Sequence, residues 1–204
     1  MSDHDVERFN RWAATYDRHY LQRIVFAPVQ KTVLDLAASQ VPRPAAILDV
    51  GSGTGRLLQA AEKLFPEATL QGVDAAVEMV KEAEASLPAD SRIKFRLATA
   101  EQLPFRDGQF DLVFSTMTFH YWADQTRGIS EMSRVLAPGG RWLLADFIAT
   151  GPMRWFFLLT RPKRFRELAQ VQSMLEASGL TVTSHKAVPR LWGQITVLAI
   201  GKRI

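Results

Sequence analysis

From residue 46 onward, the chain alternates between two hydrophobic patterns. Short apolar runs indicate buried strands, and apolar residues recurring every three or four positions indicate helices. We predict strands at 46–50, 69–74, 93–97, 110–115 and 141–147. The helices between them are predicted at 56–65, 76–87 and 124–136. Strands and helices that alternate in this way form right-handed crossovers, so the strands form a parallel sheet.

The pattern changes toward the C-terminus. A helix is predicted over 164–178, and two strands, 180–187 and 194–200, follow it with no helix between them. These two strands must therefore pair as an antiparallel hairpin. Residues 1–40 are predicted to be helical, with Phe9, Trp12, Tyr16 and Tyr20 on one face. Such an aromatic stripe packs into a core or folds over a site as an N-terminal helical lid.

Length and composition exclude several classes of protein. The 204 residues are 47% hydrophobic, which suits a single domain over 1–204 with a full core. The absence of cysteine excludes disulfides, cysteine-bound zinc, thiolate nucleophiles and iron–sulfur clusters. The histidines lack metal-ligand spacing, so we predict no metal. The N-terminus is polar, and no apolar run reaches the roughly 20 residues of a membrane span. We expect a cytoplasmic protein.

The net charge of +4 is unevenly distributed. Residues 151–204 carry nine Lys and Arg but only two Asp and Glu. A small basic and aromatic segment at 152–168 contains Arg154, Arg161, Lys163, Arg164 and Arg166 beside Trp155, Phe156 and Phe157. The segment is interpreted either as a solvated face over buried rings or as a contact surface for an anionic substrate. Peripheral membrane contact through 154–166 is a further alternative.

A glycine-rich loop, Gly51 to Gly55, follows the first strand and begins a helix. In parallel sheets, ligands bind beyond the carboxyl ends of the strands, where this loop lies. Its spacing is G-x-G-x-G. The dinucleotide fingerprint is G-x-G-x-x-G, and this chain has Arg56 where the third glycine would be, which argues against a nicotinamide oxidoreductase. Asp74 ends the second strand, where a carboxylate accepts hydrogen bonds from a ribose diol. Asp49 either holds an ammonium group or fixes the glycine turn.

Five blocks in order resemble one known family. The run from Ile47 to Gly55 resembles the first motif of class I S-adenosylmethionine (SAM) methyltransferases, and Val73-Asp74 resembles the acid that follows it. Later family blocks are similar to 98–105, 110–113 and 134–140. Residues 9–17 are similar to the N-terminal helix of the quinone-biosynthesis-like branch, methyltransferase type 11. The resemblance spans about residues 9–147.

The resemblance implies an α/β fold: a single doubly wound, Rossmann-like, seven-stranded sheet, mostly parallel with an antiparallel last strand and with helices on both faces. It implies SAM as the cofactor. Asp49 and the main chain of Gly51 and Gly53 would hold the methionine part, with Ser52 in the same loop. Asp74 would bind the ribose, and Ala75 would lie beside the adenine. The adenine edge would face Thr99 and Ala100, where the family commonly has Asp. Ser115 and Thr116, at the end of the fourth strand, would contact the methionine end or the surroundings of the transferred methyl.

Methyl transfer needs a general base only if the acceptor loses a proton, because the sulfonium is already an activated electrophile. His120, which follows the fourth strand, is the first candidate base, with Tyr16 and Tyr121 as alternates. The expected acceptor is a small apolar or aromatic molecule, because Trp12, Phe119, Trp122, Trp155 and Phe156 are expected around the pocket.

Other partners and functions stay open at this stage. The missing Asn-Pro-Pro-Tyr-type block argues against a nucleic-acid base as acceptor. Alternatives are an inactive module that binds SAM or S-adenosylhomocysteine (SAH), and a methyltransferase acting on an anionic macromolecule such as tRNA. The sequence does not determine the oligomeric state.

Overall fold

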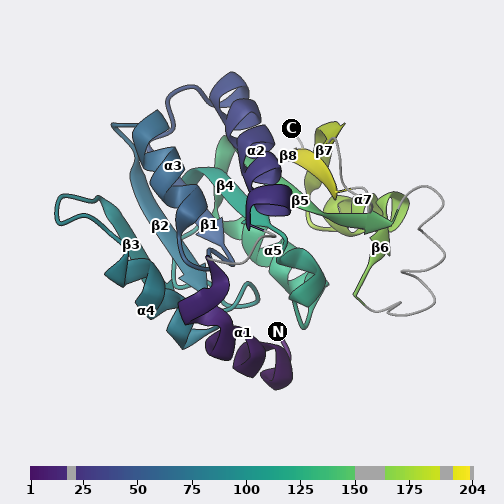
Figure 1. Cartoon of the computed structure of the whole chain (residues 1–204). Helices are drawn as coiled ribbons and strands as arrows, with labels where there is room; N and C mark the ends of the chain where they lie inside the picture. The colour runs from purple at the N-terminus through teal and green to yellow at the C-terminus, as the bar shows by residue number, and fades with distance from the viewer. Residues whose placement is uncertain (18–21, 150–163, 189–194, 203–204) are drawn as a thin grey trace.

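The computed structural model describes residues 1–17, 22–149, 164–188 and 195–202. Its main sheet runs in the order β3-β2-β1-β4-β5-β8-β7 (Figure 1). The strands are β1 Ala46–Val50, β2 Thr69–Asp74, β3 Ile93–Leu97, β4 Phe110–Thr116, β5 Leu136–Ala149, β7 Leu180–Ala187 and β8 Ile195–Lys202. The first five are parallel, whereas β8 is antiparallel to both of its neighbours. The predicted mostly parallel sheet and its C-terminal antiparallel hairpin are confirmed.

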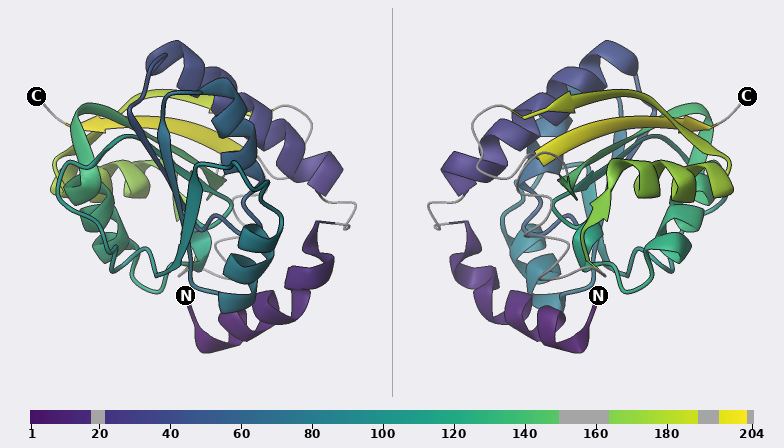
Figure 2. Two further views of the ribbon diagram at one scale, coloured as in Figure 1. Left: turned by 90° about the vertical axis from the view of Figure 1, so that its left-hand side faces the viewer. Right: turned by 90° about the vertical axis from the view of Figure 1, so that its right-hand side faces the viewer.

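Helices cover both faces of this sheet, as the two side views in Figure 2 show. On one face lie α2 Ala27–Gln40, α3 Arg56–Leu64 and α4 Val77–Ala85, and on the other lie α5 Gln125–Val135 and α7 Leu168–Ala177. Alternate residues of the central strands enter the two cores: Ile47 of β1 packs with the first group and Leu48 with the second. The fold is therefore doubly wound. Among the described residues, no helix has the length and apolarity that a membrane crossing requires.

The N-terminal region divides into two parts. Helix α1, Asp3–Tyr16, packs against α4 at one end of the sheet, and a short π-helical turn, Gln22–Phe26, leads into α2. Helix α2 buries Val29, Val33 and Ala37 in the core beside β4, β5 and β8. The expectation of one lid over 1–40 is therefore wrong for α2, because its apolar face is needed to cover the sheet. A lid role for α1 stays a prediction.

Two elements begin four or more residues away from the predicted position. The helix expected over 164–178 begins at Leu168, because Arg166–Glu167 form the two-residue strand β6 beside Ile148 and Ala149 of β5. Glu167 then caps the helix in a capping box with Gln170. Strand β5 begins at Leu136 rather than 141, with a break in its register against β4 over the Pro-Gly-Gly turn. Residues 152–163 of the basic and aromatic segment lie outside the described residues.

The glycine loop is fixed to the end of the neighbouring strand. The backbone N–H groups of Gly51 and Ser52 donate to the carbonyl of Val73 at 2.8 and 3.0 Å. Gly51 has a φ of +77°, and a Cβ there would lie only 2.2 Å from the Thr118 hydroxyl oxygen. A side chain is thus excluded by both backbone conformation and space. The loop therefore brings its main chain directly against the segment after β4.

Candidate functional site

A pocket of about 630 Å³, part of it open to solvent, lies where β1, β2 and β4 end and α1 crosses them. Ten of the residues expected from the sequence line it: Tyr16, Gly51, Gly53, Asp74, Ala75, Thr99, Ala100, Thr116, Tyr121 and Trp122. Seven further lining residues were not expected from the sequence: Met1, Val50, Met79, Ala98, Glu101, Met117 and Thr118. The lining is thus a polar floor from the strand ends and an apolar rim.

Asp74 is held in place by the backbone. Its Oδ2 accepts from the N–H of Gly53 and its Oδ1 from the N–H of Ala76, both at 2.9 Å. Burial raises the pKa of this carboxyl, and the backbone N–H groups of Ala76, Gly53 and Ala75 oppose that rise. Each carboxylate oxygen has a second lone pair, so Asp74 can accept two further hydrogen bonds from a ligand diol.

Asp49 lies beneath the loop, with 1% of its surface exposed. Its Oδ1 is buried and has no hydrogen-bond partner, and the same holds for the Ser52 hydroxyl. Burial and the negative charge of Asp74 raise the pKa of Asp49 to about 8. The loop amides of Gly51 and Ser52 bond to Val73 instead, so Asp49 does not fix the turn through them. Two unpaired polar groups at the glycine loop leave hydrogen-bonding capacity for a ligand.

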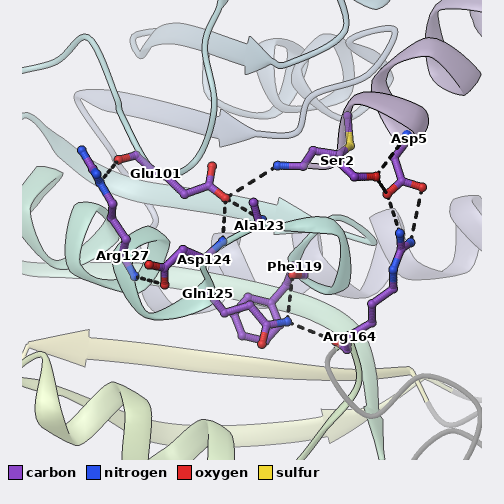
Figure 3. Close-up of polar contacts among 10 residues, drawn as sticks. Ser2, Asp5, Glu101, Phe119, Ala123, Asp124, Gln125, Arg127 and Arg164 are labelled. Atoms are coloured by element: carbon purple, nitrogen blue, oxygen red, sulfur yellow. Dashed lines mark hydrogen bonds and ion pairs between the residues drawn. The ribbon is translucent and has the colours of Figure 1, made fainter.

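A further carboxylate, that of Glu101, lies in the pocket lining close to Thr99, the residue expected at the adenine edge. Thr99 lines the pocket, and Glu101, two residues later, lines it too. Glu101 Oε1 accepts from the N–H groups of Ala123 and Asp124 at 2.7 and 3.2 Å (Figure 3). Burial raises the pKa of Glu101, but the backbone N–H groups of Glu101 and Asp124, the positively charged N-terminus and the Thr99 hydroxyl outweigh it, and the pKa is lowered overall. The sequence does contain a signal for Glu101: it is an acid two residues after Thr99, the position where the family commonly has Asp.

Helix α1 forms the apolar rim and is anchored along its length. Asp5 pairs with Arg164 at 2.5 Å near its start (Figure 3), and Asn10 accepts from the N–H of Glu78 at 3.0 Å. At its C-terminal end, Asp17 accepts from the hydroxyl of Thr54 in the glycine loop at 2.8 Å. These bonds tie α1 to three other segments around the pocket.

The aromatic residues near the pocket lie in three places: in its lining, on the surface and in the core. Phe9 lines it and meets Tyr121 edge to face, with ring centroids 5.2 Å apart. Trp122 lines it as expected, but Trp12 is 51% exposed and outside it. Phe119 is in the core instead. The other two expected rings, Trp155 and Phe156, lie outside the described residues.

Two further candidates lie behind the pocket wall. His120 is buried and its Nδ1 lies 2.6 Å from Asp146 Oδ1, while its ring centroid is 4.1 Å from that of Tyr121. Ser115 is fully buried and accepts a hydrogen bond from the Trp142 indole, so its side chain is not in the pocket. Thr116, the next residue of β4, lines the pocket instead, because successive side chains of a strand point to opposite faces. Among the described residues, no group of three or more His, Asp or Glu is arranged to hold a metal ion.

Comparison with known proteins agrees with this geometry. Residues 48–144 match the family model described as "Methyltransferase domain". The chain is 39% identical over 143 residues to malonyl-[acyl-carrier protein] O-methyltransferase of Geobacter sulfurreducens, covering 68% of this chain and 51% of that protein. It is 37% identical over 121 residues to demethylmenaquinone methyltransferase of Thermus thermophilus, covering 58% and 53%. The chain thus spans about half the length of these two curated relatives.

A third relative is covered more fully. The uncharacterized methyltransferase YcgJ of Bacillus subtilis is 32% identical over 171 residues, covering 79% of this chain and 67% of that protein. Among solved structures, a SAM-dependent methyltransferase from Aquifex aeolicus has the same fold, with a TM-score of 0.72 at 20% identity and coverage of 96% and 98%. The ordered motifs, the doubly wound sheet and these relatives agree, and the chain belongs to the class I SAM-dependent methyltransferase family, in its methyltransferase type 11 branch.

Proposed function

We propose that the chain binds SAM in the pocket at the glycine loop and transfers its methyl group to a small, apolar or aromatic acceptor. The observation that carries the proposal is the pair Asp49 and Asp74 at adjacent strand ends. Asp74 offers free lone pairs to a diol, and Asp49 is a buried carboxyl with an unpartnered oxygen. A ligand with a ribose and a cationic amino acid end matches both groups.

Each part of the cofactor has a partner in this chain. Asp74 would hold the ribose, Asp49 and the loop at Gly51 to Gly53 the methionine end, and Thr99 with Glu101 the adenine amine. When bound, SAM supplies a methyl group on a positively charged sulfur. The chain's own contribution is to orient that group and to exclude water, which well-aligned sites convert into large rate gains. Phe9 and Tyr16 on α1, which line the pocket, would help to exclude water from it.

The acceptor is proposed from the apolar rim. Phe9, Tyr16, Met79, Tyr121 and Trp122 present rings and a thioether to the pocket, and such linings select apolar or aromatic ligands. The names of two relatives, a malonyl-[acyl-carrier protein] O-methyltransferase and a demethylmenaquinone methyltransferase, are compatible with an acyl or quinone acceptor. Where the acceptor atom carries a proton, we assign its removal to His120.

Calorimetric titration with SAM tests the cofactor site. Asp74→Ala should weaken SAM binding about 10- to 100-fold, because hydrogen bonds to a charged group contribute roughly 1.5–3 kcal/mol. The matched control is Asp35→Ala, an exposed carboxylate on α2 that pairs with Lys31. Equal SAM affinity of Asp74→Ala and wild type would refute the site.

A screen with labelled SAM tests the transfer. Quinones, phenols and carboxylic acids are offered as acceptors, and we expect label in one of these classes. Tight SAM binding with no label transferred to any of them would favour the inactive binding module.

A further inference from the structure

A buried carboxylate contacts the candidate base. Asp146 lies on β5, is fully buried, and places its Oδ1 2.6 Å from Nδ1 of His120. The same oxygen lies 2.6 Å from the donating N–H of Phe147, and Oδ2 lies 3.4 Å from the N–H of His120. The sequence predicts a role for His120 but gives no signal for Asp146, because the two residues are 26 positions apart and meet only through the β4–β5 pairing.

These contacts determine which imidazole nitrogen carries the proton. Both oxygens of Asp146 face backbone N–H groups, those of Phe147 and His120, so the carboxylate acts as a hydrogen-bond acceptor here. An ionised carboxylate only accepts hydrogen bonds, so Nδ1 of His120 must be the donor. In neutral His120, the lone pair is then on Nε2. Among the described residues no hydrogen-bond partner contacts Nε2.

Aromatic rings fix the orientation of the imidazole. Phe165 stacks on it with ring centroids 5.4 Å apart and an interplanar angle of 18°. Phe147 approaches it at 5.7 Å and 69°, and Tyr121, which lines the pocket, lies at 4.1 Å. The ring is thus held by one carboxylate and three neighbours, next to the wall of the pocket.

We propose that Asp146 is a positioning residue, which holds His120 in the Nδ1–H tautomer so that Nε2 accepts the proton of the methyl acceptor. The proton of the acceptor atom would move to Nε2. The electron pair left on that atom would bond the methyl carbon as the bond from this carbon to the SAM sulfur breaks, and the electron pair of the broken bond would stay on the sulfur of SAH. Asp146 accepts a hydrogen bond throughout and does not take the proton. This inference rests on the proposed function for its chemical use, whereas the tautomer is a property of the protein alone.

Nitrogen-15 spectroscopy of the full chain tests the tautomer without any ligand. The protein has four histidines, and the His120 signals are assigned by their loss in His120→Gln. In wild type at a pH where His120 is neutral, we expect the proton on Nδ1 and an unprotonated Nε2. In Asp146→Ala, which removes the acceptor, the Nδ1–H fraction should fall and Nε2–H should appear.

The control is Thr196→Val. Thr196 is a buried polar residue on β8, directly opposite Asp146 in the strand pairing, and no described hydrogen bond joins it to His120. Its replacement should leave the tautomer unchanged. A proton on Nε2 in wild type, or an unchanged tautomer in folded Asp146→Ala, overturns the proposal. If Asp146→Ala does not fold, the wild-type spectrum still decides the first of these outcomes.

Kinetics give a second readout. With an acceptor found in the labelled-methyl screen, Asp146→Asn should lower kcat by roughly 10²- to 10⁴-fold, the usual contribution of general base catalysis. KM for SAM should stay within about twofold, because Asp146 is not in the pocket lining. A raised KM with unchanged kcat contradicts a positioning role. Failure of the proposed function is seen separately, as a wild-type chain that does not bind SAM.

Discussion

At the scale of single residues, Asp49 makes the ligand-free protein sensitive to pH. Its pKa is raised from 3.8 to about 8 by burial and by Asp74. Between these two pH values the folded chain keeps a proton on Asp49 that the unfolded chain has lost. The unfolding free energy therefore decreases as pH rises through this window, by at most roughly 1.4 kcal/mol per pH unit from this group.

The variant Asp49→Asn is expected to remove that dependence, because its amide is neutral at every pH. Urea denaturation at about pH 5, 6.5 and 8 should show this variant to be more stable than wild type at the highest pH, with a difference that shrinks toward the lowest. A difference that is constant over this range would mean that Asp49 ionises in the folded protein like an exposed carboxylate.

Met117 is a second residue whose conformation only the structure reveals. It lies in the pocket lining just after β4 and has a φ of +58°, which is unusual for a side chain other than glycine. A β-branched residue tolerates this conformation worst, so Met117→Ile should cost about 1–3 kcal/mol of unfolding free energy. Met117→Leu, which is unbranched at Cβ, is the control and should cost clearly less. Denaturant unfolding measures both, and equal losses would contradict backbone strain.

At the scale of elements, α1 is the part of the site that depends most on a few polar contacts. Asp5 is buried on α1 and pairs with Arg164 and Arg8. Arg164→Ala removes the closer pair while Arg8 remains, and we expect a loss of roughly 1–2 kcal/mol in the docking of α1, because the Arg164 side chain is partly exposed. Hydrogen exchange of residues 3–16 should then become about tenfold faster or more.

Exchange in α5 should not change in this variant. The matched control is Lys31→Ala, which breaks an exposed pair on α2 and should leave α1 as protected as in wild type. Unchanged exchange of α1 in Arg164→Ala would mean that Asn10 and Asp17 anchor the helix without the ion pair.

At the scale of the whole molecule, a ligand in this pocket connects α1 with the ends of three strands. Binding to the folded state alone stabilises a protein by about 2.7 kcal/mol at a ligand concentration of about 100 times Kd. For a chain of this size, SAM should then raise Tm by roughly 5–10 °C. Scanning calorimetry with SAM and with NADH measures this. An equal rise with NADH would point to a dinucleotide site instead.

The sequence by itself determined the order of elements and the polar floor of the site. Strand runs and helix periods are local, so β1 to β4 were predicted nearly to the residue. Gly51, Gly53 and Asp74 were predicted because the loop and the acid each follow a strand, and parallel strands end at one edge of the sheet. The antiparallel β7–β8 hairpin followed from the missing helix between its strands.

Only the tertiary structure decided which side chains meet across the sheet. Glu101 reaches the pocket through its bonds to the start of α5, and Asp146 reaches His120 because β5 lies beside β4. The Ser115 side chain points away from the pocket and contacts Trp142 of β5. Alternation along β4 is local, but which of its two faces packs against this ring is decided by the assembled sheet. Helix α2 lies over the core rather than over the site, because its apolar residues pack against strands that are distant in the sequence. Such contacts depend on distances between segments far apart in the chain, which no local pattern encodes.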